Sequence, residues 1–67
     1  MSIGIYSGKN VIITNTEGKE FKGYVCDYFY PDENESGKES IILDCTTGAA
    51  IEFFPEDISN VTILEEE

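Results

Sequence analysis

The sequence predicts an all-β domain, most simply a small five-stranded barrel. Short apolar runs are separated by glycine, asparagine and aspartate, a pattern typical of small barrels and sandwiches. No window of about eleven residues holds a helical apolar period, which argues against a long helix. The chain has 67 residues, of which 40% are hydrophobic, so it predicts one domain with one modest core.

The charge balance is strongly acidic. Fourteen aspartates and glutamates stand against four lysines, with no arginine or histidine, and the net charge is -10. Nucleic-acid affinity comes mainly from cations that displace counterions, so a nucleic-acid partner is not expected. The acidity fits a soluble surface, and it also fits a basic partner, a cation or mimicry of a nucleic acid.

The N-terminal residues 1–9 lack the basic region and apolar run of a signal peptide. No stretch approaches the ~20 apolar residues of a membrane span. We therefore expect a cytoplasmic protein with reduced thiols and no membrane contact. No motif for a cofactor is present, and none is expected.

The first half of the chain predicts a lead-in and two strands. In the lead-in, residues 1–8, Ile3, Ile5 and Tyr6 are expected to cover one open end of the barrel, and two glycines argue against a stable helix. A first strand is expected over residues 9–16.

A tight turn at Gly18 leads into a long second strand over residues 19–30. Gly23 lacks a Cβ, which predicts either a sharp bend in that strand or the close approach of another backbone. Pro31 ends it by removing a donor, and residues 31–40 form a polar loop.

The second half predicts three more strands. The third is expected over residues 39–45 and the fourth over 49–54, joined by a turn at Gly48. A single helical turn over residues 55–58 follows, because proline and acids favour a first turn. The last strand, residues 60–64, places Val61 and Ile63 on one face, and residues 65–67 form an acidic tail.

Residues 8–64 resemble the Sm-like (LSm) domain family. The resemblance is carried by residues 8–11, 17–23, 51–58 and 61–63. More narrowly, the chain is similar to the short, acidic, uncharacterised LSm-domain proteins of Gram-positive bacteria. The resemblance implies a bent five-stranded barrel of the SH3-like type, RNA binding, and assembly into rings through the fourth and fifth strands.

The sequence departs from the family where the family binds RNA. Phe54 and Pro55 stand where Sm proteins place an arginine–glycine pair that holds a base. The longer polar loop does not align Asp32 or Asn34 with the family's base contacts. The resemblance therefore carries over the fold, and RNA binding remains an alternative function.

Cys26 and Cys45 are predicted on neighbouring strands. The chain has no histidine to activate a thiolate and no CxxC motif. Acidic neighbours, Asp27 and Asp44, should raise a thiol pKa. We expect free cysteines that act as small apolar residues, with a cross-strand disulfide as the alternative.

The polar loop matches the first half of a calcium loop. Asp32, Asn34 and Ser36 alternate, and Gly37 follows, as in oxygen-ligand loops. The twelfth position is Leu43 rather than glutamate, and a hydrophilic turn explains the same residues. Calcium binding is the second alternative.

The aromatic residues suggest an interface. If Phe21, Val25 and Phe29 point inward, strict alternation turns the tyrosines of the second strand outward. Exposed tyrosines are enriched in protein interfaces. The candidate interface residues are Tyr24, Tyr28, Tyr30, Phe54, Ile63 and Leu64. The alternative is that the strand bends and buries some tyrosines.

The sequence thus favours a non-enzymatic interaction module that binds a protein partner or itself as a homo-oligomer. A catalytic site is not expected, because a barrel of this size seldom forms a concave pocket alone.

Overall fold

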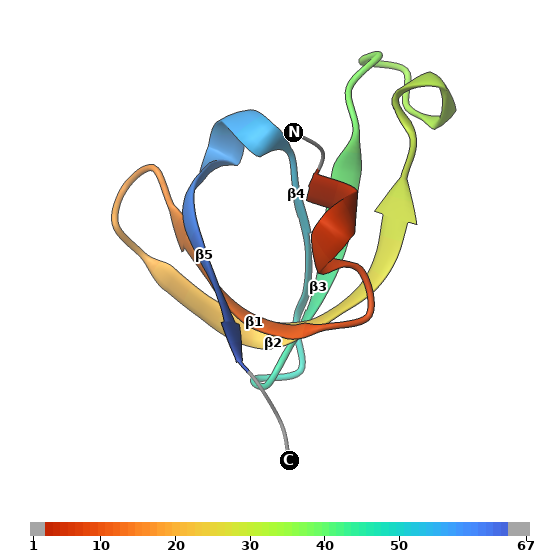
Figure 1. Ribbon diagram of the computed structural model, residues 1–67. Coiled ribbons are helices and arrows are strands. Elements are labelled where there is room, and N and C mark those ends of the chain that lie inside the picture. Colours follow the sequence, from red (N-terminus) through yellow and green to blue (C-terminus); the bar gives the residue numbers. More distant parts are fainter. Residues whose placement is uncertain (1–2, 65–67) are drawn as a thin grey trace.

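The computed structural model describes residues 3–64 and confirms the predicted all-β class. Five antiparallel strands form one sheet in the order β4-β3-β2-β1-β5. Their bounds are β1 Asn10–Asn15, β2 Glu20–Phe29, β3 Ser40–Cys45, β4 Ala50–Phe53 and β5 Ile58–Leu64. The helical segments within this part are 3-10 turns: η1 Ile3–Tyr6, η2 Pro31–Glu33 and η3 Pro55–Asp57. The sheet curls around a central core but does not close by pairing its edge strands (Figure 1).

The helical turn before the last strand is confirmed, but β5 begins earlier than predicted. The turn ends at Asp57 and β5 starts at Ile58, because Asn15 of β1 pairs with Ile58 after an irregularity in the ladder. The predicted acidic tail, residues 65–67, lies outside the described residues.

The lead-in forms the short 3-10 turn η1. Ile3 and Tyr6 pack against the core as expected, whereas Ile5 is 50% exposed. The prediction that all three cover an open end is therefore wrong for Ile5, because a 3-10 turn directs successive side chains to different sides.

The two hairpin turns, at Gly18 and Gly48, have the same hydrogen-bond pattern. In each, a glycine N–H donates to a carbonyl three residues earlier, Gly18 to Asn15 at 3.0 Å and Gly48 to Cys45 at 2.9 Å. The φ angles of these glycines are 86° for Gly18 and 99° for Gly48, a region that favours residues without a Cβ. Both predicted turn glycines therefore have the conformational role assigned to them.

Gly23 is the residue of β2 at which pairing with β3 begins. It lies opposite Val11 of β1 and Cys45 of β3, and it is buried. A Cβ built at Gly23 would meet the Asp44 carbonyl oxygen and would lie 2.8 Å from the Cys45 Cα. The prediction that this position requires a missing Cβ is confirmed.

A β-bulge interrupts β2 three residues later. Val25 lies opposite Leu43, but the next paired residue is Asp27, opposite Ile42, so Cys26 has no partner in the ladder. A bulge adds one residue to one strand and reverses the side-chain alternation beyond it. Residues of β2 after Cys26 therefore face the opposite side from that predicted.

The core lies on the inner face of the curled sheet. Each of β1 to β4 contributes from this face, in strict alternation on β1 and β3. The buried apolar residues are Val11, Ile13, Val25, Ile41, Leu43, Cys45 and Phe53.

Replacing Gly23 by alanine tests the close approach of β2 and β3. We expect Gly23→Ala to lower the free energy of unfolding by about 1–3 kcal/mol, because the added Cβ forces two backbones apart. Lys22→Ala, the exposed neighbour, should stay within about 0.5 kcal/mol of the parent. Urea melts followed by circular dichroism measure both, and equal midpoints for Gly23→Ala and the parent would contradict the close packing.

Candidate functional site

The edge strand β4 has a free backbone edge. Cys45 N–H donates to the Ala49 carbonyl at 2.8 Å, which fixes the ladder between β3 and β4. Antiparallel pairs alternate between bonded and non-bonded residues. Ile51 therefore bonds back to β3, while the N–H and C=O groups of Ala50 and Glu52 point away from it. Within residues 3–64, β4 has no strand on that side.

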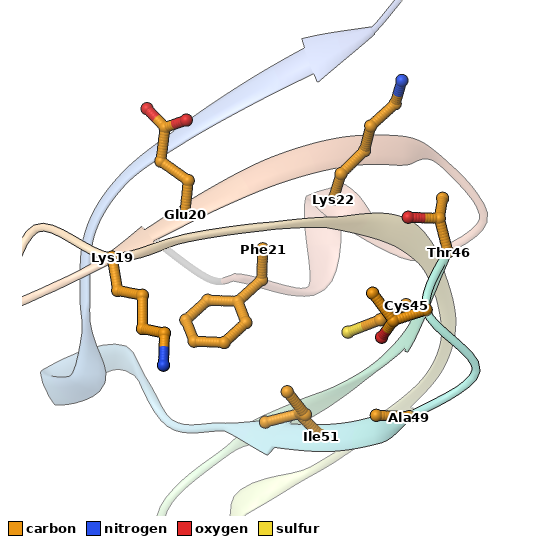
Figure 2. Close-up of a pocket in the computed structure, with 9 residues that line it drawn as sticks. Lys19, Glu20, Phe21, Lys22, Cys45, Thr46, Ala49 and Ile51 are labelled. Atoms are coloured by element: carbon orange, nitrogen blue, oxygen red, sulfur yellow. The ribbon is translucent and has the colours of Figure 1, made fainter.

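A gap lies beside this edge, because β3 pairs with β2 only from Gly23 onward. Residues 19–21 therefore have no partner in β3 and face residues 49–53 across a space, while the Lys22 carbonyl accepts from the Thr46 N–H at 3.0 Å. We call this space the open seam. In Figure 2, Phe21 from β2 and Ile51 from β4 point toward one another across it. Both side chains are only partly buried.

The first hollow in the seam is mainly apolar and has a volume of about 370 Å³. Phe21, Cys45 and Ile51 line it. The Lys19 Nζ lies 5.8 Å from the centroid of the Phe21 ring, within reach of a cation–π interaction. Figure 2 shows Lys19 on the hollow side of β2, whereas Lys22 points away.

The second hollow, about 290 Å³, is aromatic and acidic. Phe21 and Phe53 meet edge to face, with ring centroids 5.5 Å apart. Glu17, Glu52 and Asp57 also line this hollow. It shares Phe21 and Ile51 with the first hollow, so the two are adjacent parts of the same seam.

Two of these carboxylates are held by neighbouring groups. The Ser40 hydroxyl donates to Glu52 Oε2 at 2.7 Å, and the Phe54 N–H donates to Asp57 Oδ2 at 3.0 Å. A carboxylate has about four acceptor positions, so one such bond leaves its charge and further acceptor capacity in place.

The predicted interface tyrosines do not share a face. Tyr24 lies opposite Asp44 on the outer face and is 44% exposed. Tyr28 lies opposite the core residue Ile41, packs on the core and donates to Glu39 Oε1 at 2.8 Å. The bulge at Cys26 separates the two, so the strict alternation was wrong beyond it.

Tyr30 follows β2 and is 61% exposed, with its ring 5.1 Å from that of Tyr28. Phe29, predicted to point inward, lies opposite Ser40 on the outer face. This too follows from the bulge. The tyrosines that remain available for contact are Tyr24 and Tyr30.

The other interface candidates lie on two different elements. Phe54 is half-buried and caps η3. Ile63 lies opposite Val11 and is 42% exposed, and Leu64 lies opposite Asn10 and is half-buried. These last two belong to β5, the second edge of the sheet.

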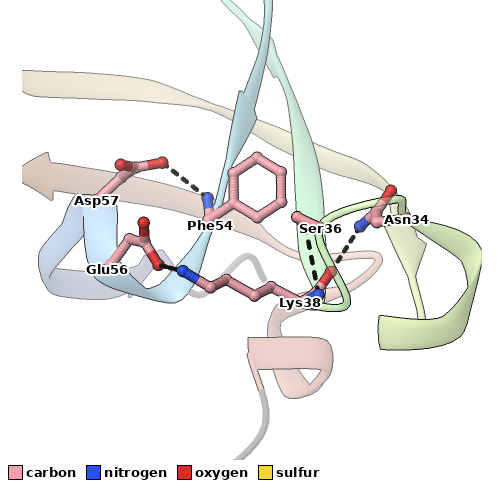
Figure 3. A network of polar contacts seen from close by, with 6 residues as sticks. All are labelled: Asn34, Ser36, Lys38, Phe54, Glu56 and Asp57. Atoms are coloured by element: carbon pink, nitrogen blue, oxygen red, sulfur yellow. Dashed lines mark hydrogen bonds and ion pairs between the residues drawn. The ribbon is translucent and has the colours of Figure 1, made fainter.

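The polar loop is bonded to itself and to η3. The Asn34 side-chain amide donates to the Lys38 carbonyl at 2.7 Å, and the Lys38 N–H donates to Ser36 Oγ at 3.3 Å (Figure 3). Lys38 Nζ forms an exposed ion pair with Glu56 at 2.6 Å. The structure thus uses Asn34 and Ser36 to fold the loop, and Asp32 lies exposed in η2.

The two cysteines are both free and differ in their surroundings. Cys26 is exposed in the bulge, whereas Cys45 is buried. Burial, and to a smaller degree the charge of Asp44, raises the pKa of the Cys45 thiol. A thiol held protonated in this way is a weak nucleophile.

Comparison with protein-family models, with curated proteins and with solved structures found no match. In the part of the chain that is described, no helix is long and apolar enough to cross a membrane. Nor do residues 3–64 gather three or more acidic, thiol or imidazole side chains in an arrangement that could hold a metal.

The residues of the open seam were not singled out from the sequence. Phe21 was expected only to point inward, and Ile51 and Glu17 appeared only within the ranges that carry the Sm-like resemblance. Gly23 marks where the pairing of β2 with β3 begins, but it does not indicate what lies across from the residues before it.

The two thiols should react at very different rates in the folded protein. We expect one alkylation per chain with iodoacetamide, at Cys26, because Cys45 is buried and its pKa is raised. Both should react in denaturant. Peptide mass mapping locates the label, and rapid labelling of Cys45 without denaturant would show that this side of the core is open.

Proposed function

We propose that the domain is a non-enzymatic interaction module that binds an extended segment of another polypeptide along the free edge of β4. The observation that carries the proposal is the juxtaposition of two features. The free N–H and C=O groups of Ala50 and Glu52 form a template for strand addition. Directly beside them, the open seam leaves Phe21 and Ile51 partly uncovered.

A single added strand would cover both the free backbone groups of β4 and the uncovered side chains of the open seam. Main-chain bonds to β4 provide affinity, and alternate side chains of the added strand reach the hollows. The same geometry permits self-association. In the ladder between β1 and β5, the N–H and C=O groups of Val61 and Ile63 point away from β1. This edge of β5 in one copy can therefore pair with β4 of another copy. The resemblance to Sm-like domains also supports this form of assembly.

The Ala50→Pro variant tests the proposal. Proline removes the outward N–H of Ala50 but no bond to β3, so the fold should persist while strand addition is lost. The matched control, Ala50→Thr, keeps the N–H. The probe is a short acetylated and amidated peptide, Thr-Val-Thr-Val-Thr, titrated to millimolar concentration while amide resonances are followed by NMR.

We expect the peptide to shift the Glu52 amide in the parent and in Ala50→Thr, but not in Ala50→Pro, in which residue 50 has no amide proton. Light scattering over a wide protein concentration range shows whether a second copy occupies the same edge. The proposal would be refuted if the protein stayed monomeric at every concentration and no peptide shifted the β4 amide resonances.

A further inference from the structure

We infer that the open seam selects a segment with a defined charge pattern: an apolar residue and, two positions away, a lysine or arginine. The occupant is a segment of a different protein rather than a second copy of this chain. The inference rests on the proposed function, since it names the partner chemistry of the same β4 edge.

The spacing follows from the positions of the two hollows along β4. The first lies beside Ala49 and Ile51, and the second beside Ile51 and Phe53. Ile51 and Phe53 are opposite core residues of β3, so both face the interior. In an added strand, residues two apart lie on one face and are separated by roughly 6–7 Å. One such residue therefore enters each hollow.

The two hollows differ in charge. Of the charged residues beside the first, only Lys19 lies on its inner side next to Phe21, whereas Glu20 and Lys22 point away. Glu17 and Asp57, and among the described residues no cation, line the second, whereas the Glu52 side chain alternates to the opposite face of β4 and accepts from Ser40. An apolar side chain of the partner would pack favourably on Phe21, Cys45 and Ile51 in the first hollow. A cation suits the second hollow, where the Phe53 ring and the acids both favour positive charge.

The volumes are consistent with single side chains. The second hollow, at about 290 Å³, lies at the small end of the range for ligand sites. An acidic residue at the same place would meet the like charges of Glu17 and Asp57, so the hollow also disfavours the wrong partner. The polarity of the seam thus also sets the direction in which a segment binds.

A second copy of this chain could supply the apolar residue of this pattern but not the basic one. Its free edge strand, β5 Ile58–Leu64, offers Val61 and Ile63 to the apolar hollow but contains no lysine or arginine. Each copy also carries a net charge of -10, which opposes close association. A basic segment of another protein meets neither obstacle.

The test compares three peptides that differ at one position. They are Thr-Val-Thr-Lys-Thr, Thr-Val-Thr-Glu-Thr and the uncharged Thr-Val-Thr-Val-Thr, each acetylated and amidated and titrated by NMR. We expect the lysine peptide to bind about fivefold more tightly than the glutamate peptide, since an exposed ion pair contributes about 0.2–1 kcal/mol. The preference should weaken as salt is raised.

Charge-reversal variants locate the effect. Glu17 lines the second hollow, whereas Glu35 is an exposed acid in the polar loop that lines neither hollow. Glu17→Lys and Glu35→Lys change the net charge equally. We expect Glu17→Lys to weaken binding of the lysine peptide about fivefold, and Glu35→Lys to weaken it much less.

The outcomes separate this inference from the proposed function. Equal affinity for the lysine and glutamate peptides, or equal effects of Glu17→Lys and Glu35→Lys, would overturn the charge pattern. In either case, shifts of the Ala50 and Glu52 amides would leave strand addition intact. If no peptide shifts those amides, and the protein stays monomeric, both the function and the inference fail.

Discussion

The architecture depends on one close backbone contact, at Gly23. There β2 pairs with Val11 on one side and with Cys45 on the other, at a separation that leaves no space for a Cβ. Before this point β2 pairs with β1 alone, and from here β3 joins on the other side while the bonds to the β1 segment continue through Tyr24 and Val25. A single strand can therefore serve both halves of the sheet, and a chain of 67 residues can enclose a core with five short strands.

The same contact explains why the sheet stays open. Because β3 pairs with β2 only from Gly23 onward, the first residues of β2 have no paired strand on the side away from β1. Phe21 and Ile51 project into that space from opposite walls (Figure 2). In a domain this small, most apolar surface is needed for stability. The aromatic and aliphatic groups left uncovered beside an unpaired backbone are thus the feature that best separates this surface from the rest of the molecule.

Much of the fold could be predicted from the sequence because local rules decide it. Alternation located the strands to within a few residues, and Gly18, Gly23 and Gly48 marked two turns and a bend that only glycine suits. The bulge at Cys26 had no such marker, since an extra residue in a strand leaves the composition unchanged. It reversed every later side chain of β2, so Tyr28 was assigned to the surface and Phe29 to the core. The seam depends on which strands fail to meet, and no local pattern encodes that.

The exposed position of Cys26 affects how assembly of this protein can be measured. An exposed thiol on the convex face, where the other cysteine is buried, lets two molecules join covalently on standing in air. Such a product has twice the mass of the monomer but leaves β4 unoccupied. Samples kept under reductant, or carrying serine at this position, distinguish that artefact of storage from genuine strand pairing. The same thiol offers an attachment point for a fluorescent reporter.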